Sequence, residues 1–154
     1  MDSYVAKLET FLRQHGIDHE LKEFPMSVHT VEMAADAAHA RIDQFIKTVI
    51  LIDKNDTLFA SIVRGDDRVS LSRSGFNLKL DGLRMAKPDE VLARTGYPIG
   101  GVPPLGFEAR FVVDVKVKEM PFCWAGGGND KALVKISPAD IIRTTAATVV
   151  RITV

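Results

Sequence analysis

Hydrophobic and polar positions along the chain mark out a series of short helices and strands. Near the N-terminus, apolar residues recur every three or four positions from Tyr4 to Leu12, which predicts an amphipathic helix that Gly16 ends. Residues 45–52 (FIKTVILI) are dominated by β-branched and aromatic side chains and therefore predict a strand. After a polar turn at residues 53–56, residues 58–63 are predicted to return as the hairpin partner of that strand.

The rest of the chain alternates between the same two kinds of element. Further strands are predicted at residues 17–24, 83–86, 110–115, 122–125, 132–136 and 148–154, and further helices at residues 31–39, 88–95 and 138–144. Thr30, Pro88 and the pair Ser137-Pro138 supply start signals for these three helices. Residues 69–80 are ambiguous, because Gly75 sits awkwardly within one long helix.

Several of the predicted strands are joined by connections too short for the crossovers that a parallel sheet needs. The expected fold is therefore of the α/β class in its α+β form, with a mixed, largely antiparallel sheet packed by several helices. No repeat, low-complexity tract or shift in composition marks a domain boundary, and 154 residues suit one core. Residues 1–154 are therefore predicted to form a single domain.

Charge and cysteine content narrow the class of protein. Lys and Arg together number 20, as do Asp and Glu, so the formal net charge is zero, which argues against nucleic-acid binding by bulk electrostatics. The single Cys123 excludes an internal disulfide and a cysteine-based metal cluster, and it fits a reducing compartment. No apolar run approaches membrane-spanning length. The expectation is a cytoplasmic protein that does not contact membranes.

The segment Gly96–Gly106 (GYPIGGVPPLG) contains four glycines and three prolines, so it cannot lie inside a helix or a paired strand. Interleaved apolar residues indicate that this loop packs onto the core. Two interpretations are open and equally supported by this segment alone. One is a tight structural connection, and the other is a stiff loop whose N–H groups face a ligand.

Lys47 is the one charged residue within the predicted strand at 45–52. By base rate its side chain snorkels into solvent near the strand end, and the alternative is a fixed cation in a pocket. A second glycine-rich segment, Gly126–Asp130 (GGGND), is by default a hairpin turn, with a ligand-facing loop as its functional alternative. Neither glycine segment matches a Walker A or dinucleotide-binding pattern.

Side chains typical of catalytic or metal sites are scarce. The four histidines lack metal-ligand spacing, and His29, which precedes the helix start at Thr30, is the one retained as a candidate. Cys123 is interpreted as a small buried hydrophobic residue, because it lies in an apolar strand without a basic neighbour. We therefore expect no metal and no cofactor, and any catalysis would depend on positioning and on backbone polarisation.

The order and spacing of five segments resemble the YbaK/ProX family of aminoacyl-tRNA deacylases, which is related to the editing domain of bacterial prolyl-tRNA synthetases. The segments are TVEMAADAA (30–38), FIKTVILI (45–52), GYPIGGVPPLG (96–106), AGGG (125–128) and SPADIIR (137–143). The resemblance implies a curved mixed sheet surrounded by helices. It also implies hydrolysis of mischarged aminoacyl-tRNA in trans, with a small amino acid such as Cys, Ala, Ser or Thr on a non-cognate tRNA.

The resemblance also assigns candidate residues. Lys47 and Gly101 fall on positions expected to act in catalysis, and we expect Gly101→Val to abolish activity while leaving the fold largely intact. Among matching positions, substrate binding is expected from Thr30, Gly100, Gly127 and Gly128. His29, Phe45 and Asn129 are further expected binding residues that the resemblance does not assign. The expected partner is the acceptor end of aminoacyl-tRNA, with a synthetase as a further candidate. The alternative function is a non-catalytic module that binds an amino acid or a tRNA end, or a synthetase accessory protein.

Overall fold

The computed structural model describes residues 1–154. Its elements, in chain order, are α1 (Ser3–Gln14), β1 (His19–Glu23), α2 (Val31–Ala38), the 3₁₀ turn η1 (Ile42–Gln44), β2 (Ile46–Ile52), β3 (Leu58–Arg64), α3 (Leu71–Leu78), β4 (Arg84–Met85), α4 (Pro88–Thr95), β5 (Arg110–Val113), α5 (Val115–Lys118), β6 (Cys123–Gly126), β7 (Ala132–Ile136), α6 (Pro138–Thr145) and β8 (Thr148–Val149). None of the helices is long and apolar enough to cross a membrane.

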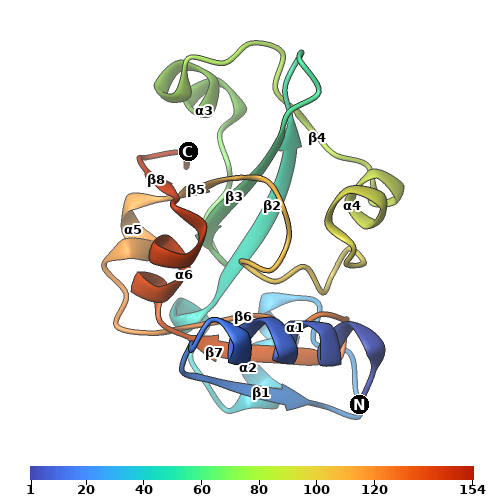
Figure 1. The fold of residues 1–154 in the computed structure, drawn as a ribbon. Helices are drawn as coiled ribbons and strands as arrows, with labels where there is room; N and C mark the ends of the chain where they lie inside the picture. The colour runs from blue at the N-terminus through green and yellow to red at the C-terminus, as the bar shows by residue number, and fades with distance from the viewer.

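The strands form two sheets rather than one. The smaller sheet is antiparallel, in the order β1-β7-β6, and the larger sheet has the order β4-β2-β3-β5-β8. In the larger sheet β2 pairs antiparallel with β3 and β4, whereas the pairs β3–β5 and β5–β8 are parallel. An isolated bridge between Phe45 and Trp124 joins the two sheets. Figure 1 shows α1 and α2 beside the smaller sheet, and α3, α4, α5 and α6 around the larger one. The expected mixed, largely antiparallel α/β class is confirmed.

Side-chain caps account for where several helices begin. The Thr30 hydroxyl accepts from Met33 N–H at the start of α2, and the Ser70 hydroxyl accepts from Arg73 N–H at the start of α3. Within the ambiguous residues 69–80, Leu71–Leu78 thus form a helix, and Val69 forms an isolated bridge with Thr153. The interior Gly75 of this helix lies close to Leu80, since an added Cβ would come within 3.1 Å of the Leu80 oxygen.

Two strands predicted in the C-terminal third of the chain are shorter than expected. Residues 110–115 were expected to form one strand, but β5 ends at Val113 because the Asp114 side chain caps α5 by accepting from Lys116 N–H. Residues 148–154 were expected to form another, yet β8 covers only Thr148–Val149. The buried Asp114 carboxylate also accepts a hydrogen bond from Ile152 N–H at 2.8 Å. The Ile152 N–H is thus bound by a side chain and not by the backbone of a neighbouring strand.

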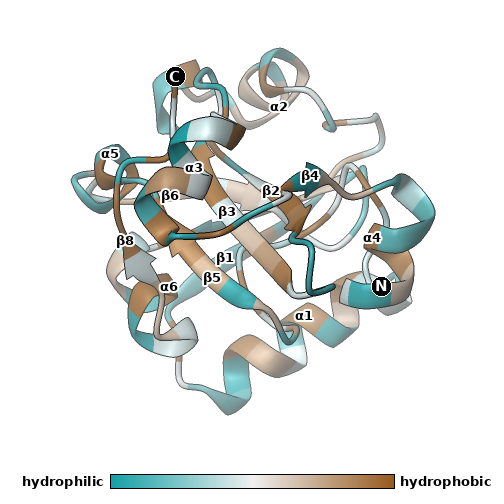
Figure 2. Cartoon of the chain, turned by 90° about the horizontal axis from the view of Figure 1, so that it is seen from above, coloured by the Kyte–Doolittle hydropathy of each residue, from teal (hydrophilic) through white to brown (hydrophobic).

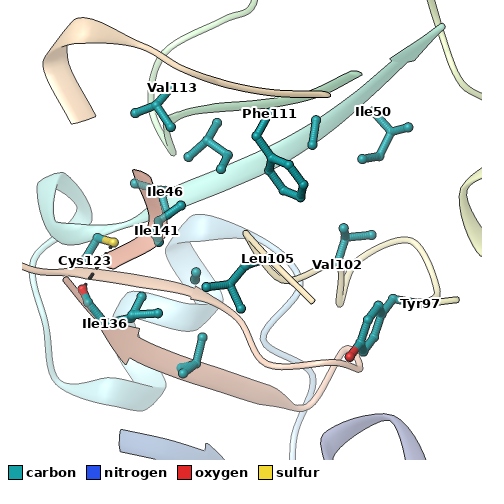
Figure 3. Packing of buried hydrophobic residues seen from close by; sticks show 14 of the residues in the cluster. Ile46, Ile50, Tyr97, Val102, Leu105, Phe111, Val113, Cys123, Ile136 and Ile141 are labelled. Carbon is teal, nitrogen blue, oxygen red and sulfur yellow. Dashed lines mark hydrogen bonds between the residues drawn. The ribbon is translucent and has the colours of Figure 1, made fainter. Parts of the chain in front are cut away.

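The main hydrophobic core lies between the two sheets, and much of it is visible in Figure 3. Three of its members, Tyr97, Val102 and Leu105, come from the glycine- and proline-rich loop, so the prediction that this loop packs onto the core is confirmed. Figure 2 shows hydrophobic residues concentrated along the central strands, with hydrophilic segments along the surrounding helices. The loop is thereby anchored at several points beside β2.

Candidate functional site

A cavity of about 270 Å³ opens beside an edge of β2 that has no strand partner. β2 pairs with β4 only at Leu51 and Ile52, and Ala86 N–H donates to the Ile50 oxygen at 2.9 Å. At its other end, Phe45 forms the isolated bridge to β6. The stretch of β2 between these two contacts faces a gap, which α2, α4 and the loop at residues 96–106 surround. Most of the side chains that line the cavity are apolar.

Lys47 lies in this stretch of β2, pairs with Val63 of β3 on the far edge, and lines the cavity with a half-buried side chain. It forms no salt bridge. Lys47 and His29 are the ionisable residues that line the cavity, and no Asp, Glu or Cys accompanies them. The cavity therefore combines apolar walls with a cation that has no acidic counter-charge. Such an environment favours a ligand with an anionic or strongly polar oxygen.

Two further candidates, His29 and Thr30, also line the cavity, at the start of α2. The Thr30 hydroxyl is used as the helix cap. His29 is exposed, and its Nδ1 lies 2.5 Å from the Ser27 hydroxyl, which fixes the orientation of the ring. A Cβ added to Gly100 would lie 3.3 Å from His29 Cβ, so the imidazole stands next to the glycine loop.

Residues Pro98 to Gly101 form a tight turn in which Gly101 N–H donates to the Pro98 oxygen at 3.1 Å. Gly100 occupies the third position of this turn with φ +88°, a conformation that favours glycine. Gly100 lines the cavity, and its N–H has no acceptor within the protein. The Gly101 N–H, by contrast, is already engaged in the turn. Gly100 therefore offers a backbone donor at the cavity that no group within the protein uses.

Four other predicted residues do not line the cavity: Gly101, Gly127, Gly128 and Asn129. A Cβ added to Gly101 would lie 2.4 Å from Asn129 Cα, and the Gly101 oxygen accepts from Gly128 N–H. Gly127 N–H donates to the Ala132 oxygen, and the Asn129 side chain accepts from Lys131 N–H. These residues hold the two loops together by close backbone packing. The N–H groups of Gly101, Gly127 and Gly128 were expected to face the substrate, but each of them donates a hydrogen bond within the protein.

The sequence did not single out Gly126, Met85 or Ile99, which also line the cavity. Gly126 is the last residue of β6, and only its position within the glycine segment hinted at a role. A Cβ there would lie 2.5 Å from the Val102 oxygen, so a side chain would collide with the loop. Met85 and Ile99 carried no local signal, because both look like ordinary apolar residues in the sequence.

Two buried groups are excluded as nucleophiles by their surroundings. Burial raises the pKa of the Cys123 thiol to about 12, and the side chain is fully enclosed outside the cavity. Burial likewise raises the pKa of Tyr97 to about 12. The interpretation of Cys123 as a small buried hydrophobic residue is therefore confirmed. No group of three or more His, Cys, Asp or Glu side chains is arranged to hold a metal ion.

Comparison with known proteins places this chain in a family. Residues 26–144 match the aminoacyl-tRNA editing domain. The uncharacterized protein YwhH of Bacillus subtilis is 27% identical over 141 residues, which cover 89% of this chain and 88% of that protein. The proline–tRNA ligase of Kosmotoga olearia is 34% identical over 110 residues, which cover 70% of this chain and 19% of the ligase. The chain thus spans only about a fifth of that ligase.

A solved structure resembles the chain along its whole length. It is a putative trans-editing enzyme for prolyl tRNA synthetase, with a TM-score of 0.91 and 27% sequence identity. The alignment covers 100% of this chain and 99% of that one. The match over residues 26–144 contains the segments that build the cavity, including Lys47 and Gly100. The chain belongs to the aminoacyl-tRNA editing domain family.

Proposed function

We propose that this protein hydrolyses the ester bond between a small amino acid and a non-cognate tRNA, and that it acts in trans on tRNA charged by a separate synthetase. The amino acid in this proposal is Cys, Ala, Ser or Thr, as the family resemblance implies, and a cavity of about 270 Å³ with mainly apolar walls admits such small uncharged side chains. The full-length likeness to a putative trans-editing enzyme supports action on a separate tRNA.

The observation that carries this proposal is Lys47, a half-buried cation without an acidic partner in an apolar cavity. Negative charge develops on the carbonyl oxygen when an ester is attacked, and fixed donors stabilise that charge more strongly when water is excluded. Lys47 and the free Gly100 N–H line the same cavity and supply two such donors. Gly100 thus takes the donor role that the sequence assigned to Gly101.

The nucleophile in this proposal is a water molecule, since neither a carboxylate nor a thiol lines the cavity. Water adds to the ester carbon, and the ribose oxygen leaves as a restored hydroxyl of the terminal nucleotide after it gains a proton. The free hydroxyl of the same ribose lies beside the ester and supports this proton transfer. An aminoacyl ester is already activated, so positioning supplies much of the rate acceleration.

Release of amino acid from a panel of charged tRNAs tests the proposal. We expect hydrolysis of Ala-, Cys- or Ser-charged tRNA, and we expect Lys47→Ala to lower kcat/KM by at least about a hundredfold, as for loss of one transition-state donor. Lys118→Ala is the matched control, because Lys118 is an exposed lysine that does not line the cavity. If the protein binds a non-hydrolysable amide analogue but hydrolyses no charged tRNA, it is a binding module instead.

A further inference from the structure

A second cavity lies on the larger sheet, away from the cavity beside β2. Its volume is about 250 Å³, and its walls come from the beginnings of β3, β5 and β8 and from the ends of α3 and α6. In Figure 1, β5 and β8 lie between these two helices. The two cavities share no lining residue, so a molecule in the second cavity need not contact the site proposed for ester hydrolysis.

Apolar side chains make up most of the walls of the second cavity. Phe59 and Phe111 contribute from β3 and β5, and Leu78 and Leu80 contribute from the end of α3. Phe59 is buried in a hydrophobic cluster against which Leu78 and Leu80 pack. These walls are therefore ordered before a ligand arrives, and an apolar group that enters them leaves water at little conformational cost to the protein.

Arg110 is the ionisable residue that lines the second cavity, and no acidic residue accompanies it. It is the first residue of β5 and pairs with Phe59 of β3, and its guanidinium carbon lies 5.5 Å from the centre of the Phe59 ring. Arg110 forms no salt bridge, even with the exposed Glu108 two residues before it. Because the planar N–H groups of a guanidinium match the two oxygens of a carboxylate, Arg110 is suited to bind one.

The carbonyl end of α6 supplies the opposite charge. Thr145 is the last residue of α6, and both Thr145 and the following Ala146 line the second cavity. The last carbonyl groups of a helix lack partners within it and carry a partial negative charge. In the turn after α6, the N–H groups of Ala146 and Ala147 both donate to the Ile142 oxygen, and the Thr145 oxygen accepts no hydrogen bond. The Thr145 oxygen is therefore available to an ammonium group.

We propose that the second cavity binds a free α-amino acid with an apolar side chain. The α-carboxylate pairs with Arg110, the α-ammonium group lies at the carbonyl end of α6, and the side chain packs against Phe59 and Leu78. At about 250 Å³ the cavity is smaller than the roughly 300–1,000 Å³ of pockets that enclose a drug-sized ligand, which suits a molecule of this size. The inference goes beyond the proposed function and does not depend on it, because it concerns free amino acid and residues outside the cavity beside β2.

L-Phenylalanine tests the second cavity directly. In a protein with ¹³C-labelled leucine and isoleucine methyl groups, we expect its ring current to shift the NMR signals of Leu78 and Leu80. Ile46 and Ile50 line the cavity beside β2 and report binding there instead. 3-Phenylpropionate lacks the ammonium group and phenethylamine lacks the carboxylate. Each should bind at least about tenfold more weakly than L-phenylalanine, as expected for loss of one charge-assisted hydrogen bond.

A variant then tests the role of the guanidinium. Arg110→Met keeps an apolar chain over Phe59 but removes the charge, so it should weaken the binding of L-phenylalanine about tenfold and abolish its advantage over phenethylamine. Because Arg110 is exposed, the variant should fold, which its methyl spectrum verifies. Arg68→Met is the matched control, since Arg68 is also exposed, forms no salt bridge and does not line the second cavity.

Several results would overturn the proposal. They are the absence of shifts at Leu78 and Leu80 up to the solubility limit of L-phenylalanine, shifts confined to Ile46 and Ile50, and unchanged binding in Arg110→Met. Equal binding of L-phenylalanine and 3-phenylpropionate would also overturn it, because the end of α6 would then contribute nothing. These measurements need neither tRNA nor catalysis, so their failure is distinct from a failure to hydrolyse charged tRNA.

Discussion

The Gly101 oxygen accepts a hydrogen bond from Gly128 N–H at 2.9 Å, and this bond joins two glycine-rich loops that are far apart in the sequence. The backbones are so close that a Cβ on Gly101 would lie 2.4 Å from Asn129 Cα. Gly101 therefore supports the loop that presents Gly100 to the cavity. The expectation that Gly101→Val would leave the fold largely intact is contradicted by this geometry.

Gly101→Ala should lower the free energy of unfolding by about 3 kcal/mol, because a new methyl group must push apart two packed backbones. Urea unfolding followed by circular dichroism measures the change. Gly16→Ala is the matched control: Gly16 has φ +62° but nothing within 4 Å, so only the backbone cost of about 1–2 kcal/mol applies. Equal losses in the two variants would contradict the close packing of the loops.

Lys47→Met should raise stability while lowering activity. The substitution removes a half-buried cation that has no acidic partner and keeps a flexible chain of similar length. We expect a gain of about 1 kcal/mol in the free energy of unfolding, as is common when a functional polar group is replaced. Lys118→Met, at an exposed position, should change stability little. A loss of stability in Lys47→Met would show that the cation has a structural partner.

Cys123 should be inert in the folded protein. Raising the pKa of a thiol from 9.0 to about 12 lowers its thiolate fraction near neutral pH by about a thousandfold. We expect no reaction with a thiol reagent such as DTNB at pH 8 until urea unfolds the chain, after which one thiol per chain reacts. Rapid labelling of the folded protein would mean that β6 opens locally.

Glu90 should titrate at unusually low pH. Hydrogen bonds from Arg84 and then from Lys87 N–H lower its pKa from 4.5 to about 2. Because the folded pKa is below the ordinary one, the stabilising contribution of this carboxylate is present above pH 4.5 and is lost as the pH falls toward about 2. NMR titration of the Glu90 side chain measures this directly.

A variant separates the two causes of the Glu90 shift. Arg84→Ala should move the Glu90 pKa back toward 4.5, since the hydrogen bond from Arg84 is the largest cause of the lowering. Arg94→Ala is the control, because Arg94 pairs with Asp56 and not with Glu90.

The same Arg84 variant also frees β4 from α4, so it should broaden the NMR signal of the Met85 methyl group.

Local signals in the sequence were sufficient for most elements. Three helices begin where the sequence predicts, at the caps Thr30 and Ser137 and at Pro88. The apolar segments β2 and β3 form the expected hairpin. These features depend on neighbours within a few positions. The extents of β5 and β8 were missed because the Asp114 carboxylate makes its bonds across the chain, to Ile152 N–H.

The sequence by itself also named Lys47, His29 and Gly100 as candidates, and all three line the cavity. Only the tertiary structure decided that Gly100 rather than Gly101 presents the free N–H, because that depends on which amide closes the turn and which backbone packs against Asn129. The division into two sheets, the cavity at the unpaired edge of β2 and the exposure of Ile99 likewise arise from long-range packing. No periodicity along the chain encodes such contacts, since they form between segments that become neighbours only on folding.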